Sequence, residues 1–187
     1  MKLKPFIEDE KIILRPLSME DIEGEYVNWL NDIEVCKYNS HHVYPYTEAQ
    51  AKEYITSVTD QKNHLVLAIV DSESGTHVGN ISLQAINLLD RSAEYAILLG
   101  NKEYWGKGVA KRASFLILKH GFESLGLHRI YCGTSANNVP MQKLAAALGM
   151  QKEGVRKEAL YKDGKYIDII DYGLLEKDFK KVYDSRE

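Results

Sequence analysis

A strand, a glycine-rich turn, a helix and a second strand follow one another in mid-chain, and this order constrains the fold most. The apolar run AEYAILLG at 93–100 predicts a strand, and HRIYCGTSA at 128–136 predicts another. Between them, GVAKRASFLILKHGFESLG places apolar residues at helical spacing. Such a unit predicts two parallel strands joined by a right-handed crossover.

The segments on either side add antiparallel strands and further helices. Short β-branched runs predict a strand at 11–16 and a hairpin over 64–86, and Asp163-Gly164 predicts a tight turn before a last strand at 168–176. Ser18 with Asp21 and Thr47 with Gln50 resemble capping boxes, so each should begin an amphipathic helix. The sequence therefore predicts an α/β fold, with a mixed sheet and helices on its faces. No linker or repeat interrupts it, which predicts a single domain over 1–187.

Composition narrows the class of protein. A hydrophobic share of 44% and a charged share of 27% are ordinary for a globular domain. The net charge of −3 gives no general affinity for nucleic acid or for an anionic membrane, so neither is an expected partner. The two cysteines are too few for a disulfide framework, and the N-terminus has no apolar run typical of a signal peptide. A cytoplasmic location is expected.

The stretch GNKEYWGKGVAKR at 100–112 resembles a nucleotide-phosphate loop, but its spacing excludes two common kinds. A P-loop needs four residues between its first Gly and its Gly-Lys, followed by Ser or Thr. Here five residues separate Gly100 from Gly106, and Gly108 follows Lys107. A dinucleotide fingerprint needs a third Gly, and none follows Gly108 at that spacing.

A metal-free anion site at the start of a helix fits the stretch better. Small residues let a ligand approach the backbone, and the free N–H groups of the first helical turn point at an anion. The candidate residues for this loop are Trp105, Gly106, Lys107, Gly108, Val109 and Ala110. No metal is expected.

Four segments in the same order resemble the GCN5-related N-acetyltransferase (GNAT) superfamily, in particular its RimJ/RimL-like branch. They are ILRPLSMEDIEGEYVNWLND, AEYAILLGNKEYWGKGVAKRA, ANNVPMQKLAAALGM and YKDGKYIDIIDYGLL, which together span nearly the whole chain. The resemblance implies a strongly twisted, mixed sheet of six to seven strands. Dimers are frequent in this family, so a homodimer is compatible with the resemblance.

The resemblance also implies a cosubstrate and a reaction. Acetyl-CoA would place its pyrophosphate on the loop 105–110 and its pantetheine arm beside the strand that contains Leu98, Leu99 and Gly100. Asn138 matches an Asn that contacts the cofactor in the family, and it also suits a helix cap. The acetyl group would pass directly to a primary amine, with a backbone N–H stabilising the oxyanion.

The sequence offers several candidates for the general base and does not decide between them. Glu94 matches a region where family members place an acidic residue, although an ordinary surface carboxylate is an equal interpretation. Asp168 and Glu158 are alternative candidates for the base. For each of them, the sequence favours a structural role. His41, His42 and Tyr44 lie in the loop that shapes the acceptor pocket in relatives. The acceptor could be a protein N-terminus, a small amine or polyamine, or an amino sugar.

Two positions depart from the family pattern. Many members carry a Tyr as general acid where this chain has Ala145, and the RimL-like branch carries a Ser where it has Met141. These departures leave a second hypothesis, a non-catalytic module that binds acyl-CoA or regulates a partner.

Overall fold

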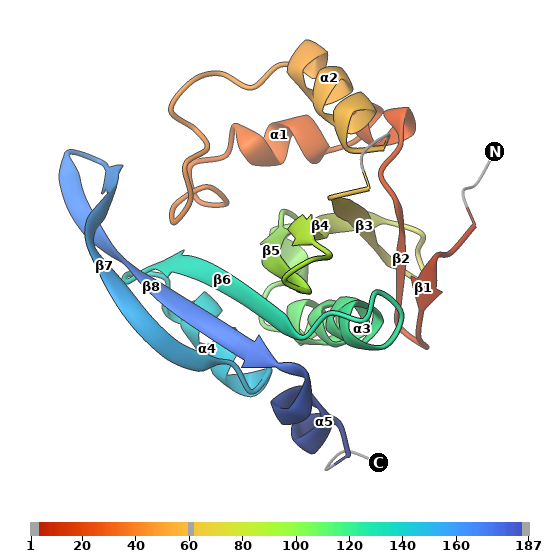
Figure 1. Ribbon diagram of the computed structural model, residues 1–187. Coiled ribbons are helices and arrows are strands. Elements are labelled where there is room, and N and C mark those ends of the chain that lie inside the picture. Colours follow the sequence, from red (N-terminus) through yellow and green to blue (C-terminus); the bar gives the residue numbers. More distant parts are fainter. Residues whose placement is uncertain (1–3, 60–61, 185–187) are drawn as a thin grey trace.

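One twisted sheet of eight strands runs through the molecule, with helices on both of its faces (Figure 1). The computed structural model describes residues 4–59 and 62–184. The strands lie in the order β1-β2-β3-β4-β5-β6-β8-β7. Their bounds are β1 Ile7–Glu8, β2 Ile12–Pro16, β3 Leu65–Asp71, β4 His77–Asn87, β5 Ser92–Leu99, β6 Arg129–Ser135, β7 Gln151–Lys162 and β8 Lys165–Leu175.

The mixed sheet predicted from the sequence is confirmed, with one strand more than expected. Neighbouring strands pair antiparallel except β5 and β6, which are parallel and are joined through helix α3 (Val109–Glu123). The additional strand is β1, which pairs with β2 through Ile7 and Glu8 alone. Two residues are too few to show the alternation by which a strand is recognised, so the count of six to seven was wrong.

The helices divide the core into two clusters, one on each face of the sheet. Helices α1 (Tyr26–Leu30) and α2 (Glu48–Thr59) cover one face. Helices α3, α4 (Val139–Ala147) and α5 (Glu176–Asp184) lie on the other face (Figure 1). Among the described residues, no helix is long and apolar enough to cross a membrane.

Both predicted capping boxes are present, but the first begins a different kind of helix. Thr47 and Gln50 exchange backbone-to-side-chain bonds of 2.9 and 3.3 Å at the start of α2. Ser18 and Asp21 likewise form a capping box, yet it starts the 3₁₀ helix η1 (Met19–Glu23), which stops before α1. The prediction of one continuous first helix was therefore wrong, although the apolar face predicted for it is buried.

The predicted turn at Asp163-Gly164 closes a long hairpin of β7 and β8. Both residues have positive φ, 52° and 76°, as a two-residue hairpin turn requires. The hairpin tip extends towards the loop between α1 and α2 (Figure 1). There the buried Lys162 ammonium donates to the carbonyl oxygens of Asn39 and His41, at 3.2 and 2.9 Å.

The parallel strands β5 and β6 separate after three paired positions. Their pairing runs from Ser92↔Arg129 to Glu94↔Tyr131, and no further rung joins them within the described residues. Beyond this point β5 stays with β4 as far as Leu99, and β6 stays with β8 as far as Ser135. The two strands thus enclose a wedge-shaped opening in the sheet.

Candidate functional site

The loop after β5 is shaped by two glycines with left-handed backbone. Gly106 and Gly108 have φ of 73° and 79°, and a Cβ at either position would meet no atom within 4 Å. Glycine is therefore needed for conformation, and the space above it stays open to a ligand. Gly108 is the N-cap of α3 and carries no side chain to block the first N–H groups of that helix.

Neighbouring side chains hold this loop against the end of β5. The indole Nε1 of Trp105 donates to the carbonyl oxygen of Leu99 at 2.8 Å. The Lys107 ammonium lies over the ring of Tyr104, 5.5 Å from its centroid. Val109 and Ala110 begin α3, so their N–H groups belong to the helix N-terminus, which favours an anion.

The edge of β5 that faces the opening carries backbone groups without a strand partner. The Gly100 N–H donates to Val78 of β4 at 3.0 Å, so alternate residues before it, such as Leu98, also face β4. The peptide groups of Ile97 and Leu99 therefore face the opening towards β6. They suit an extended ligand that pairs like an additional strand.

Gly100 itself has a packing role. A Cβ there would lie 2.0 Å from Cδ2 of the buried Trp29, so only glycine lets the indole ring cover this point. Trp29 belongs to the core cluster on the face that carries α1 and α2.

Asn138 occupies the cap of α4 that the sequence predicted. Its Oδ1 accepts from the Met141 N–H at 3.1 Å. Ala145 is fully buried, and Met141 packs against the core of the α3 face. The cofactor contact of Asn138 stays a prediction.

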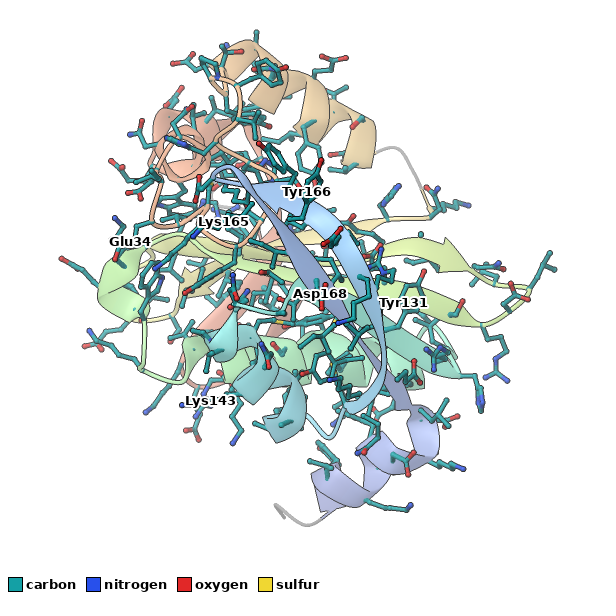
Figure 2. All side chains as sticks on the ribbon, turned by 90° about the vertical axis from the view of Figure 1, so that its left-hand side faces the viewer. Glu34, Tyr131, Lys143, Lys165, Tyr166 and Asp168 are labelled. Atoms are coloured by element: carbon teal, nitrogen blue, oxygen red, sulfur yellow. The ribbon has the colours of Figure 1, made fainter. Side chains whose placement is uncertain are left out.

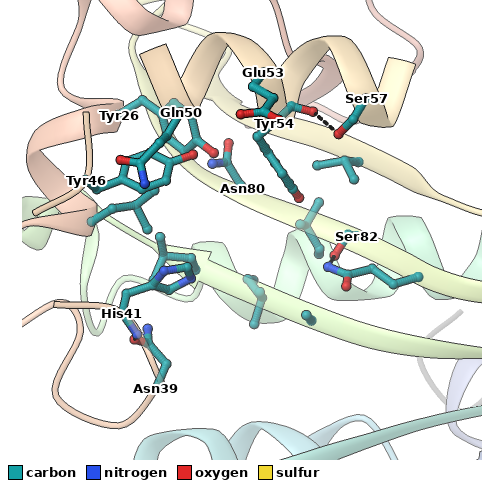
Figure 3. Close-up of a pocket in the computed structure, with 17 residues that line it drawn as sticks. Tyr26, Asn39, His41, Tyr46, Gln50, Glu53, Tyr54, Ser57, Asn80 and Ser82 are labelled. Atoms are coloured by element: carbon teal, nitrogen blue, oxygen red, sulfur yellow. Dashed lines mark hydrogen bonds between the residues drawn. The ribbon is translucent and has the colours of Figure 1, made fainter. Parts of the chain in front are cut away.

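A cavity of about 670 Å³ lies between α2 and the sheet, on the face that carries α1 (Figure 3). Ala96, Ile97 and Leu98 of β5 form part of its floor, so it borders the opening between β5 and β6. Its other lining residues are Tyr26, Leu30, Asn39, His41, Tyr46, Gln50, Glu53, Tyr54, Ser57, Val66, Asn80, Ile81, Ser82 and Gln84.

Helix α2 supplies one wall of this cavity, which we call the acceptor cavity. Gln50, Glu53, Tyr54 and Ser57 recur at spacings of three and four residues and therefore share one face of the helix. Tyrosines complete the wall. Burial raises the pKa of Tyr54 and of Tyr26, so both phenols stay protonated at neutral pH.

Glu94 lies beside the acceptor cavity, at the last rung before β5 and β6 separate. Its register partners are Gln84 of β4, which lines the cavity, and Tyr131 of β6. Glu94 also lines a second hollow of about 550 Å³ over β6, β7 and β8. The charged residues there include Arg156, which binds Asp171 through its Nε and Nη2 atoms at 2.9 Å. Glu94 is exposed to water.

The alternative bases are held in structural contacts. Asp168, on β8 (Figure 2), accepts from the Lys157 ammonium at 2.8 Å and from the Glu158 N–H at 2.9 Å. Glu158 has a φ of 50° where β7 shifts its register against β8. These contacts favour a structural role for the Asp168 carboxylate, and Glu158 takes part in them through its backbone.

The three residues predicted to shape the acceptor pocket, all in the loop between α1 and α2, do not share one position in the structure. His41 lines the acceptor cavity, whereas His42 and Tyr44 do not, and the Tyr44 side chain is 82% exposed. The partial removal of its ring from water and the nearby Lys162 ammonium lower the pKa of His41. His41 is therefore mostly neutral at pH 7.

This loop is fastened at its base and at two further points. Asn31 bonds both backbone groups of Tyr46 at 2.8 Å, which closes residues 32–45 into a loop. Lys102, from the segment after β5, reaches Asp32 and Glu34 at 2.8 Å each. With Lys162 of the hairpin, these contacts connect the glycine loop, the acceptor cavity and β7.

A buried ion pair supports the cavity wall from behind. Asp21 accepts from two nitrogens of Arg15 at 2.9 and 2.6 Å, and its Oδ1 lies 3.2 Å from His77 Nδ1. The Nε2 atom of His77 lies 2.9 Å from the Asn80 side-chain oxygen, and Asn80 lines the cavity. Burial would raise the pKa of Asp21, but its bonds to Arg15 and His77 outweigh burial and hold it far below its ordinary value.

The fold and the site define a class of protein. A mixed sheet whose parallel central strands separate, a glycine loop at the start of a helix and an adjoining cavity agree with the acyl-CoA-dependent transferase that the sequence resemblance implies. Within the described residues, no group of three or more His, Cys, Asp or Glu could hold a metal ion.

The chain belongs to the acetyltransferase (GNAT) domain family, which it matches over residues 11–151. The uncharacterized N-acetyltransferase p20 of Bacillus licheniformis is 31% identical over 176 residues, 91% of this chain and 96% of that protein. The spermidine N(1)-acetyltransferase of Escherichia coli (strain K12) is 30% identical over 158 residues, 84% of this chain and 82% of that protein.

A solved structure shares the fold. The crystal structure of spermidine N-acetyltransferase from Vibrio cholerae in complex with CoA and spermine superposes with a TM-score of 0.84 at 24% identity, covering 92% of this chain and 99% of that one. The protein is accordingly an N-acetyltransferase, which favours the enzyme over the non-catalytic module.

Proposed function

We propose that the protein transfers the acetyl group of acetyl-CoA directly to a small primary amine bound in the acceptor cavity. The observation that carries this proposal is the meeting of two features at β5. The opening towards β6 borders one edge of this strand, and the cavity floor includes its residues 96–98.

Contacts for the pyrophosphate and for the pantetheine arm of the cosubstrate support this proposal. The glycine loop 105–110 would hold the pyrophosphate through backbone N–H groups at the start of α3. The peptide groups of Ile97 and Leu99 would pair with the pantetheine arm. Acetyl-CoA supplies the activated acyl group, and Asn138 would contact it beyond its role as a cap.

The protein's own residues then bind the amine and move its proton. An alkylamine is mostly protonated at neutral pH, so a base must remove a proton before the nitrogen attacks. We assign this role to Glu94 because it pairs with Gln84, which lines the cavity, and stands at the last rung before β5 and β6 separate. A β5 backbone N–H that faces the opening would donate to the developing oxyanion. Since Ala145 replaces the usual Tyr, water would protonate the departing thiolate.

The lining of the cavity favours a small amine over the other acceptors. It contains neither Lys nor Arg, so the phosphates of a nucleotide-linked amino sugar would find no cationic partner there. The spermidine activity named for two relatives points the same way.

Release of free thiol from acetyl-CoA tests the proposal across a panel of amines. Polyamines and diamines should be turned over faster than an amino sugar nucleotide or an N-terminal peptide. Tight binding of CoA without thiol release on any amine would instead support the non-catalytic module.

Four expectations from the sequence belong to this proposal. They are membership of the RimJ/RimL-like branch, a cytoplasmic location, a homodimer, and one domain over 1–187. The continuous sheet through both halves of the chain supports the last of them.

A substitution of Gly108 distinguishes its contribution to CoA binding from its contribution to the stability of the fold. G108A should lower the free energy of unfolding by about 1 kcal/mol, the usual cost of a left-handed alanine. It should also raise the Kd for CoA about tenfold, because the methyl group enters the space where the pyrophosphate binds. Calorimetric titration and chemical denaturation measure the two effects.

Gly75 provides the matched control. It has a φ of 72° in the turn after β3, and a Cβ there would also meet nothing within 4 Å. G75A should cost the same stability and leave the Kd for CoA unchanged. If both variants bound CoA as tightly as the wild type, the loop would not be the pyrophosphate site.

A further inference from the structure

We infer that Glu53 forms a subsite for a second positive charge on the acceptor, so that the enzyme selects an aliphatic diamine or polyamine over a monoamine. This inference rests on the proposed function and assigns a specificity-determining residue within the same cavity.

The charge of the cavity is the first observation. Among its lining residues, Glu53 is the one Asp, Glu, Lys or Arg side chain. Within the described part of the chain its carboxylate has no ion pair, in contrast to Glu48 on the same helix, which lies 3.9 Å from Lys52. A free carboxylate in an otherwise neutral cavity favours a cationic ligand over a neutral or anionic one.

The surroundings of Glu53 are the second observation. Figure 3 shows Glu53 and Tyr54 leaving α2 on the side of the cavity, with the rings of Tyr46 and Tyr26 nearby. Aromatic faces attract an ammonium group, and amide and hydroxyl groups such as those of Gln50 and Ser57 can accept its hydrogen bonds. The wall is thus suited to hold an ammonium without a tight ion pair.

The third observation is the separation of Glu53 from Glu94. Helix α2 packs over β3, and Val66 of β3 lines the cavity, whereas Ala96 lies two strands away on β5. Two strand spacings amount to about 10 Å. An acceptor would therefore place its reactive nitrogen at β5 and its second ammonium near α2, with a chain of several methylene groups between them.

The two carboxylates would then have different tasks. Glu94 removes a proton from the reacting nitrogen, whereas Glu53 binds a nitrogen that stays charged. Loss of Glu53 should weaken binding and leave the chemical step intact, which is the kinetic signature of a group that contacts ground state and transition state equally.

Three probes of one length test the charge at the distal end. They are 1,6-diaminohexane, n-hexylamine and 6-aminohexanoate, which end in an ammonium, a methyl group and a carboxylate. At saturating acetyl-CoA, the wild-type KM for the diamine should be about 5- to 10-fold below that for hexylamine. The KM for 6-aminohexanoate should be the highest.

Substitution of Glu53 should remove this ranking. E53Q should raise the KM for the diamine to that of hexylamine while kcat stays within about twofold. E53K should make 6-aminohexanoate the better substrate of the two charged probes. E48Q, the same change five residues earlier on α2, should leave all three values as in the wild type.

Calorimetric titration of the CoA-loaded protein with the same probes makes the result independent of turnover. If no probe releases thiol, the proposed function fails, and Glu53-dependent binding of the diamine still decides the inference. Equal wild-type KM or Kd values for diamine and hexylamine would overturn it. So would an E53Q variant that keeps the preference for the diamine.

Discussion

E94Q should lower kcat by about 10²- to 10⁴-fold, the usual contribution of a positioned general base. Glutamine keeps the size of the side chain and its place between Gln84 and Tyr131, but it cannot accept the proton of the incoming ammonium. Because Glu94 is exposed and its carboxylate forms no ion pair with another described residue, the fold should be unaffected. Steady-state rates with a diamine acceptor, together with a thermal melt, measure both effects.

The control for this variant is E73Q, an exposed glutamate in the turn between β3 and β4. It should leave kcat unchanged. A rate for E94Q within twofold of the wild type would remove Glu94 from the mechanism and leave proton removal to water. A more alkaline pH should partly restore the E94Q rate, because free amine then becomes abundant without help.

D21N should lower the free energy of unfolding by about 3–5 kcal/mol, the loss expected when one partner of a buried ion pair is removed. Asparagine would leave the Arg15 guanidinium without its anion and would remove the contact to His77. The disturbance should reach the acceptor cavity through Asn80, so the KM for the amine should rise as well. Urea denaturation and acceptor kinetics provide the two measurements.

The pH dependence of stability distinguishes this effect from a simple loss of packing. The pKa of Asp21 is lowered in the folded state, so its contribution is complete above the ordinary value of 3.8 and is lost as the pH falls below it. The gap between wild type and D21N should therefore narrow below pH 3.8. The control E23Q removes an exposed charge on the same segment and should change stability by at most about 0.5 kcal/mol. A constant gap down to low pH would exclude the ion pair as the cause.

Features with a local chemical cause could be predicted from the sequence. The glycine loop is an example, because its left-handed residues, the preceding strand and the following helix adjoin one another in the chain. The turn at Asp163-Gly164 and the cap at Asn138 are further examples, since each requires only two to four residues.

The acceptor cavity could not be predicted in this way. Its walls come from α1, α2, the loop between them, β3, β4 and β5, which only the folded sheet brings together. In the sequence, the polar stripe that includes Gln50 and Glu53 resembles the solvent face of an ordinary amphipathic helix. Tyr26 lies on the buried face of α1. It is buried at 3% exposure, yet it also lines the cavity, and a helical pattern cannot separate these two roles.

The three rungs between β5 and β6 have a mechanical consequence. They are the seam between two sub-sheets, one built from β1 to β5 and the other from β6, β8 and β7. We expect a seam this short to resist twisting and bending less than the longer antiparallel ladders on either side of it. A ligand that bonds to both β5 and β6 would add hydrogen bonds between the two sub-sheets and hold them together more firmly. Bound acetyl-CoA would then contribute part of the rigidity of the complex. The free protein, before binding and after product release, would be more flexible.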